Sequence, residues 1–369
     1  MSQKPLTYHD AGVHYDVLDA FKRSCQSNAG RTVGMLAAHG MREAAGTRGE
    51  SCYLVETADE YLAHVEEALG TKILVADAVY AATGRRHDAG IAYDDVATIV
   101  NDLVSCGALP TVVAMYAAVG DDAYLADPRR AEDLARGFAD ACAVSGAAWG
   151  GGETQTLRGM VTPGTVILGG SAMGRIAPKS LRVAGDVRAG DAIVCLASSG
   201  VHTNGLTLCR AVAERAEGGY AAPLDGGRTY GEALLDPSVI YVPFVAACQR
   251  AGIVLRYCVH VTGHGWRKLM RLDAPFVYHV DRLPEPQPVF RFLQRHTGLD
   301  DREAYGTFNM GVGWVAYVRP DDADRCVETA RAAGFDAWVA GEVRDEGGRK
   351  GVTLAPLGIS WSGESLALR

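Results

Sequence analysis

The stretch AYDDVATIVNDLVSCGALP (residues 92–110) contains a strong fold signal. Its apolar residues recur at the spacing of one helical face, which predicts a helix with that side buried. The residues that form this face are Val96, Ile99, Val100 and Leu103.

The same predicted helix carries polar side chains. Asp94 and Asn101 are seven residues, or two turns, apart, so they share a face, and Asp95 and Asp102 lie beside them. Carboxylates and an amide that point into a cleft would suit Mg²⁺, a hard cation that takes oxygen ligands and shares phosphate oxygens. The usual fate of such residues is a solvated acidic face, and the sequence leaves both interpretations open.

Outward from this helix, strand and helix patterns alternate along the chain. Residues 127–146 predict a helix that begins with Pro128 in its first turn and ends at Gly146. Strands are predicted at 112–120, 164–176, 191–198 and 310–318, and further helices at 207–216, 238–252 and 321–334. This pattern predicts an α/β (α+β) protein with two domains, 1–172 and 173–345, and a loosely held tail at 346–369.

The composition limits the class of function. The chain has 369 residues, 48% of them apolar, and a net charge of −8, which argues against partners such as nucleic acid or an anionic membrane. No run is long enough to span a bilayer, and no signal peptide is recognised. The nine scattered cysteines form no Cys-x-x-Cys pair, which favours a reduced, cytoplasmic protein.

Two glycine-containing turns precede predicted helices. In SSGVHTNGLTLCR (198–210), backbone N–H groups at the helix start could bind an anion, with His202, Thr203 and Asn204 as further donors. A plain strand-to-helix turn explains this stretch equally well. In HVTGHGWRKLM (260–270), the glycines make a helical metal pair of His260 and His264 improbable, so a turn with polar donors is the better interpretation.

Two further stretches bear on ligand binding. WGGGETQTLRG (149–159) is interpreted as a loop whose glycines admit a ligand and whose Glu153 could bind a metal, an ammonium or a hydroxyl. ETADEYLAHVEEALGTK (56–72) has the apolar spacing of a short amphipathic helix that stops at Gly70. Its Gly-Thr-Lys end is similar to part of a phosphate loop.

Taken in order, several blocks resemble the phosphoribosylformylglycinamidine cyclo-ligase (aminoimidazole ribonucleotide synthetase) family of purine biosynthesis. They span nearly the whole chain and are TYHDAGVHYD (7–16), VNDLVSCGALP (100–110), GGET (151–154), SGVHTNG (199–205), YGEALLDPSVIYV (230–242), HVTGHG (260–265) and TFNMGVG (307–313). The resemblance implies a homodimer whose N-terminal sheets pair into a barrel, a C-terminal α/β domain, and the use of ATP and Mg²⁺. It implies ring closure to aminoimidazole ribonucleotide through a phosphorylated amide oxygen.

The resemblance also implies roles for individual residues. Asp94 and Asp102 would bind Mg²⁺ with Asn101 beside them, and Lys72, His202 and His260 would be catalytic or orient the substrate. The nucleotide or substrate phosphate would be bound by Gly70, Thr71, Lys72, Gly151, Gly152, Glu153, Ser199, Gly200, Thr203, Asn204, Thr262 and Gly263.

The chain departs from the family before Gly70, where the family has Thr-Asp-Gly-Val-Gly-Thr-Lys. One alignment keeps Asp59 as the metal-binding acid and inserts about ten residues; the other is ungapped and puts Glu67 there. His264 and Trp266 are further departures. Three functions therefore remain open: the cyclo-ligase, an ATP-dependent paralogue with another substrate in a specialised pathway, and a non-catalytic binding or regulatory relative.

Overall fold

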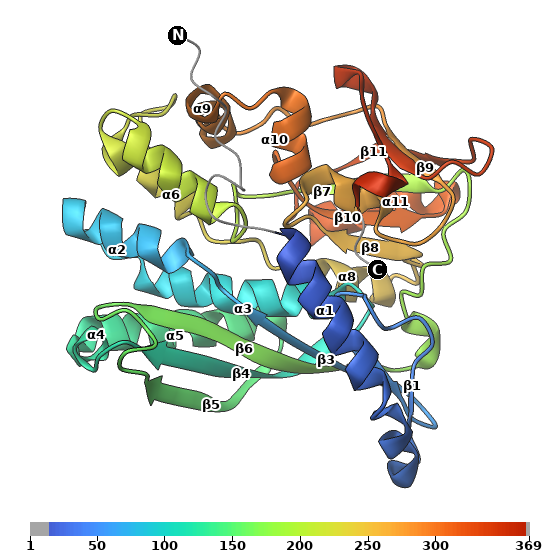
Figure 1. The fold of residues 1–369 in the computed structure, drawn as a ribbon. Coiled ribbons are helices and arrows are strands. Elements are labelled where there is room, and N and C mark those ends of the chain that lie inside the picture. Colours follow the sequence, from blue (N-terminus) through green and yellow to red (C-terminus); the bar gives the residue numbers. More distant parts are fainter. Residues whose placement is uncertain (1–14, 367–369) are drawn as a thin grey trace.

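The helix predicted at the opening stretch is α3 (Asp88–Val104), and it lies at the centre of the molecule. The structure, a computed structural model, describes residues 15–366. Val96, Ile99, Val100 and Leu103 are fully buried, as predicted. Figure 1 shows α3 between the first sheet and the second half of the chain, with α5 beside it.

The first domain is built on a six-stranded sheet in the order β1-β2-β3-β6-β4-β5. Neighbouring strands are antiparallel, except that β4 and β5 are parallel. Its elements are α1 (Tyr15–Gly30), β1 (Arg42–Glu43), β2 (Tyr53–Glu56), β3 (Tyr61–Ala68), α2 (Lys72–Thr83), α3, β4 (Leu109–Val119), α4 (Ala123–Ala126), α5 (Pro128–Ser145), β5 (Ala148–Thr156) and β6 (Val166–Ile176).

The second domain contains a seven-stranded sheet in the order β13-β12-β9-β11-β7-β10-β8. Its elements are β7 (Ala192–Ala197), α6 (Leu206–Arg215), α7 (Tyr230–Leu234), α8 (Val242–Arg250), β8 (Tyr257–His260), the 3₁₀ helix η4 (Gly265–Met270), β9 (Val277–Val280), α9 (Pro288–Thr297), α10 (Asp301–Thr307), β10 (Val312–Val318), α11 (Ala323–Ala332), β11 (Ala337–Arg344), β12 (Gly351–Leu354) and β13 (Ile359–Ser362). The expected mixed α/β architecture with two domains is confirmed.

The prediction of a helix over residues 56–72 is wrong. Residues 61–68 form β3, whose eight residues all pair with β6, and α2 begins only at Lys72. A short apolar run fits helical and strand spacing alike, and here pairing with strands far along the chain decides the conformation. Ala63 and Val65 face the buried side of the strand, and period-two alternation places Glu67 on the same face.

Two further expectations need correction. Residues 148–156, predicted as part of a loop, form the exposed edge strand β5. The segment after 345 is not a separate tail, because β12 pairs with β9 and β13 pairs with β12. Strand β6 also continues to Ile176, so the connection between the two sheets lies between 176 and 192 rather than at 172.

One face of the first sheet is open to solvent. Helices α3 and α5 cover the opposite face, against which Val113 and Ala172 are buried (Figure 1). Val112 and Met173 pair across β4 and β6 and are 37% and 53% exposed, and Ile167 further along β6 is 48% exposed. Within the described residues, this face therefore presents apolar side chains that no element covers.

Candidate active site

A cavity of about 520 Å³ lies between the two domains, where several of the motifs described above meet. Six segments line it: α1, residues 49–51, the end of β3 with Gly70, one face of α3, the turn that follows β7, and the turn that follows β8 together with η4. These turns are the ones in which the sequence predicted anion-binding donors. The geometry thus brings together segments that are far apart in the chain.

Three carboxylates line this cavity: Glu67 from the end of β3, Asp102 from α3, and Glu50, which contacts Tyr257 and Arg271. The side chain of Glu67 is exposed to the solvent in the cavity, yet many protein atoms surround it at longer range and reduce its hydration. The resulting desolvation, followed by repulsion from Asp102, raises the pKa of Glu67 to about 7. A cation bound near both Glu67 and Asp102 would reduce the repulsion between them and favour the ionised form of Glu67.

Asp102 is held by a histidine from the other domain. The Nδ1 atom of His260 lies 2.8 Å from Oδ1 of Asp102, and both residues are largely buried. Burial opposes ionisation of Asp102, but His260, Lys268 and Arg271 together outweigh it and lower its pKa. Asp102 is therefore a carboxylate at neutral pH, fixed in orientation by His260.

The turn after β7 contributes Thr203 and Asn204. The hydroxyl oxygens of Thr203 and Thr98 are 2.9 Å apart, which joins this turn to α3. The Oδ1 atom of Asn204 accepts a bond from the N–H of Gly263 at 3.2 Å, which joins it to the turn after β8. These contacts hold the predicted donor turns at the wall of one cleft.

His202 lies in the same turn but is buried away from the cavity. Its backbone is left-handed (φ 58°), and its Nε2 accepts bonds from the N–H groups of Ser199 and Val239 at 3.3 and 3.4 Å. Burial, followed by the charges of His260 and Lys72, lowers its pKa well below the usual value. A neutral histidine that accepts backbone bonds positions the turn, so the predicted proton-transfer role has no support.

Lys72, Asp94 and Asn101 also lie outside the cavity. The Nζ atom of Lys72 is 2.6 Å from Asp94 and donates to the carbonyl of Asp236 at 2.8 Å. Asp94 accepts from the N–H of Ser238 at 2.6 Å. The amide of Asn101 bonds the carbonyl of residue 239 and the N–H of residue 241, both at 2.8 Å.

The shared face of Asp94 and Asn101 was therefore predicted correctly, but its partner is protein. Both side chains bind the backbone of residues 236–241, which belong to the second domain. Burial raises the pKa of Asp94 despite the neighbouring lysine. In this structure these residues join the two domains and do not line the cavity, so the phosphate and metal contacts expected of them stay a prediction.

The remaining predicted residues divide between the cleft and other places. Gly70, Thr262 and Gly263 line the cavity. Three others have protein partners instead. The hydroxyl of Thr71 lies 3.4 Å from that of Thr207, and the hydroxyl of Ser199 donates to the carbonyl of Pro237 at 2.6 Å. The carbonyl of Gly200 accepts a bond from the side-chain amide of Asn309. Gly151, Gly152 and Glu153 lie on the exposed strand β5, away from this cavity.

The two candidate acids before Gly70 are clearly separated. Asp59 lies in the turn between β2 and β3, whereas Glu67 lies near the other end of β3. Eight residues of extended strand put them roughly 25 Å apart. Only Glu67 lines the cavity with Asp102, so the geometry agrees with the ungapped alignment.

Several cavity residues were missed by the sequence reasoning. Thr98 is one turn before Asp102 on α3, and helical spacing alone could have placed both on one face. Lys268 and Arg271 follow the turn after β8, and Lys22 and Arg23 come from α1. Nothing in the local sequence indicates that these cations converge, because their neighbours come from distant segments. The block at 7–16 lies almost entirely outside the described residues.

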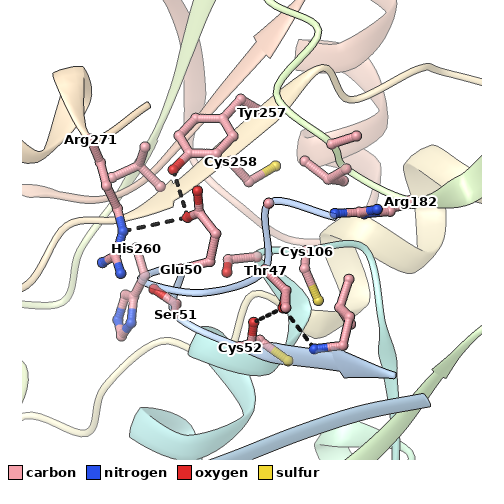
Figure 2. Close-up of a pocket in the computed structure, with 16 residues that line it drawn as sticks. Thr47, Glu50, Ser51, Cys52, Cys106, Arg182, Tyr257, Cys258, His260 and Arg271 are labelled. Atoms are coloured by element: carbon pink, nitrogen blue, oxygen red, sulfur yellow. Dashed lines mark hydrogen bonds and ion pairs between the residues drawn. The ribbon is translucent and has the colours of Figure 1, made fainter. Parts of the chain in front are cut away.

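A second, much smaller cavity lies beside His260 and shares Glu50, Ser51 and Arg271 with the first. Its volume is about 30 Å³, the room of a single water molecule. Figure 2 shows Glu50 between Tyr257, which donates to it at 2.9 Å, and Arg271, at 3.5 Å. This cavity is too small for a nucleotide, and we take it as the support behind Asp102 and His260.

The residues present fit a magnesium ion that is bound mainly through a ligand. No three His, Cys, Asp or Glu side chains gather as a metal-binding set within residues 15–366. Mg²⁺, however, is commonly bound through one or two carboxylates together with phosphate oxygens and water. Glu67 and Asp102 supply such a pair, and their mutual repulsion favours a cation between them.

The fold and the cleft define a two-domain α/β protein of the AIR synthase related class. The chain matches the family models described as AIR synthase related protein, N-terminal domain, at residues 49–176 and C-terminal domain at residues 188–353. It belongs to the phosphoribosylformylglycinamidine cyclo-ligase family, a family of enzymes.

Named relatives cover most of the chain. The phosphoribosylformylglycinamidine cyclo-ligase of Chromobacterium violaceum is 33% identical over 94% of this chain and 98% of its own length. That of Paraburkholderia phymatum is 34% identical over 93% of this chain and 93% of its own length. That of Methanocaldococcus jannaschii is also 34% identical, over 79% of this chain and 80% of its own length.

Solved structures share the fold at lower identity. AaThiL complexed with AMPPCP and TMP is 13% identical with a TM-score of 0.58, covering 95% of this chain and 96% of its own. The HypE–HypF complex is 15% identical with a TM-score of 0.60, covering 85% and 92%. Among the described residues, no helix is long and apolar enough to cross a membrane.

Proposed function

We propose that this protein closes the imidazole ring of aminoimidazole ribonucleotide from formylglycinamidine ribonucleotide, with ATP and Mg²⁺. The observation that carries the proposal is the pair Glu67 and Asp102 in an interdomain cleft lined by donor turns, in a chain about one-third identical to enzymes named for this reaction. A phosphoryl group passes from ATP to the amide oxygen of the substrate. A nearby amine nitrogen then attacks the carbon of that amide, and phosphate leaves as the ring closes.

The residues of the cleft would act mainly by position and charge. When bound, Mg²⁺ would neutralise phosphate charge during the transfer. Glu67 and Asp102 would hold it, and His260 would keep Asp102 oriented. Thr203, Asn204 and the backbone at Gly263 would offer hydrogen bonds to phosphate or substrate. Such placement of the reacting groups provides much of the rate enhancement in phosphoryl transfer.

The direct test measures ADP release by the purified protein with Mg-ATP and formylglycinamidine ribonucleotide. We expect ADP formation that requires both the ribonucleotide and Mg²⁺. If Mg-ATP binds but this ribonucleotide yields no ADP, the cyclo-ligase proposal fails and a paralogue with another substrate takes its place. If Mg-ATP does not bind at all, the protein is a non-catalytic relative.

The expectation of a cytoplasmic protein stays a prediction.

Magnesium binding is expected to weaken as the pH falls through 7. The pKa of Glu67 is raised to about 7, so lowering the pH protonates this carboxylate and removes its negative charge. Between pH 8 and pH 6 its ionised fraction falls about tenfold, and the affinity for Mg²⁺ should fall about as much. Calorimetric titrations at the two pH values measure this change. Glu67→Gln should bind weakly at both, and equal affinities in the unchanged protein would remove Glu67 from the metal site.

We also propose that the protein is a homodimer that pairs the open faces of two first sheets. The apolar side chains of Val112, Ile167 and Met173 on that face support this arrangement, because two copies would cover them. Met173→Asp is expected to weaken the dimer at least tenfold by burying a carboxylate among apolar groups. Light scattering across a dilution series gives the mass. The control is Val254→Asp, an exposed apolar position in the second domain, which should stay dimeric.

A further inference from the structure

Lys268 is a buried cation at the wall of the cleft. It lies on η4 and is 7% exposed, and it lines the same cavity as Glu67 and Asp102. Its Nζ atom donates to the hydroxyl of Thr262 and, at 3.4 Å, to the carbonyl of His260. An ammonium group has three N–H donors, so these two contacts leave one donor unused within the described part of the chain.

The electrostatic surroundings of Lys268 are unusual for a lysine. Removing an ammonium group from water is costly unless opposite charge compensates it. Burial and the charge of Arg271 disfavour its protonated form, whereas Asp102 and Glu67 favour it, and its pKa is lowered to about 8. Lys268 is therefore mainly charged at neutral pH, and Asp102 and Glu67, which line the cavity with it, supply compensating negative charge.

The two carboxylates cannot serve both cations equally well. A divalent ion between Glu67 and Asp102 would take up the negative charge that compensates Lys268 and would repel its ammonium group. A cleft that held the metal and the lysine alone would carry an excess of buried positive charge. A polyphosphate removes this excess, because its oxygens accept the unused N–H donor and share the metal.

We propose that Lys268 binds a phosphate group of the nucleotide and so weakens binding of the metal alone at Glu67 and Asp102 relative to binding of the metal together with that phosphate. This inference rests on the proposed use of Mg-ATP at the cleft. Lys268 repels free Mg²⁺ from the carboxylates, and it attracts the metal–polyphosphate complex through its negative oxygens. The residue thus couples metal binding to nucleotide binding.

The experiment compares Lys268→Met with the unchanged protein in two calorimetric titrations, one with Mg²⁺ alone and one with AMPPCP in the presence of Mg²⁺. Loss of a charge-assisted hydrogen bond should weaken AMPPCP roughly 10- to 100-fold. Loss of the repulsion should tighten binding of Mg²⁺ alone. These opposite changes distinguish the proposal from a structural role, which would weaken both or neither.

Three variants complete the design. Lys268→Arg keeps the charge and should retain part of the AMPPCP affinity, and Lys268→Gln replaces the Met variant if that one does not fold. Lys350→Met removes a lysine that pairs with Asp273 on the surface, and should change neither titration. Unchanged AMPPCP affinity in a folded Met or Gln variant overturns the proposal. If the unchanged protein does not bind AMPPCP, the proposed function fails first, so the two failures are distinguishable.

Discussion

Asp94→Asn is expected to lower the free energy of unfolding by about 3–5 kcal/mol, because it leaves the buried ammonium group of Lys72 without its counter-charge. Lys72 and Asp94 are both fully buried, and their charged atoms are 2.6 Å apart. An asparagine can still accept the bond from the N–H of Ser238, so the variant isolates the ion pair from the domain contact. Urea denaturation followed by tryptophan fluorescence measures the loss.

The double variant Lys72→Met with Asp94→Asn is the matched control. Replacing both members of a buried pair by neutral residues of similar size is often close to neutral, so the double variant should be more stable than Asp94→Asn alone. If Asp94→Asn unfolds at the same urea concentration as the unchanged protein, the pair contributes nothing to the domain junction. A loss of Mg-ATP affinity in a fully stable Asp94→Asn variant would instead return Asp94 to the metal site.

Asp102→Asn is expected to lower kcat/KM for ADP release roughly 10²- to 10³-fold, because it removes one of the two charges that would hold Mg²⁺. The substitution removes a carboxylate that faces the cavity and that His260 holds at 2.8 Å. The amide keeps nearly the same size but removes a charge beside buried Lys268, so the melting temperature is measured with the rate, and activity is compared where the variant is folded. Steady-state kinetics with Mg-ATP and formylglycinamidine ribonucleotide give the ratio.

Asp59→Asn is the control for this prediction. Asp59 is the competing acid of the gapped alignment, but it lies in the turn between β2 and β3, far from the cavity. Its substitution should leave kcat/KM within about twofold, since exposed polar changes away from a site have small effects. Full activity in Asp102→Asn would remove Asp102 from the mechanism, and a large loss in Asp59→Asn would favour the gapped alignment.

The candidate site was only partly predictable from local sequence. The turns at 199–205 and 260–265 were recognised from glycines that precede helices, and Thr203, Asn204, Thr262 and Gly263 do line the cleft. The spacing of Asp94 and Asn101 correctly placed them on one face of α3. What that face contacts was not encoded locally, because the partner of Asp94 is a backbone N–H 144 residues away.

The sequence by itself determined the elements whose signals are local. Helix α5 begins after Asp127, whose side chain caps it, and ends at a left-handed Gly146, as its sequence predicts. Helix α3 buries the apolar face that its spacing defines. The two-domain α/β architecture follows from such elements in order, because helical and strand periodicities are properties of neighbouring residues.

Only the tertiary structure decided two matters. Residues 61–68 became a strand because β2 and β6 offer backbone partners on both sides, although their apolar spacing also fits a helix. Of the acids on α3, Asp94 joins the two domains and Asp102 faces the cleft, because a different distant segment packs over each. The physical reason is the same in both cases: hydrogen-bond and charge partners come from far along the chain, and they determine which of several locally acceptable arrangements has the lowest free energy.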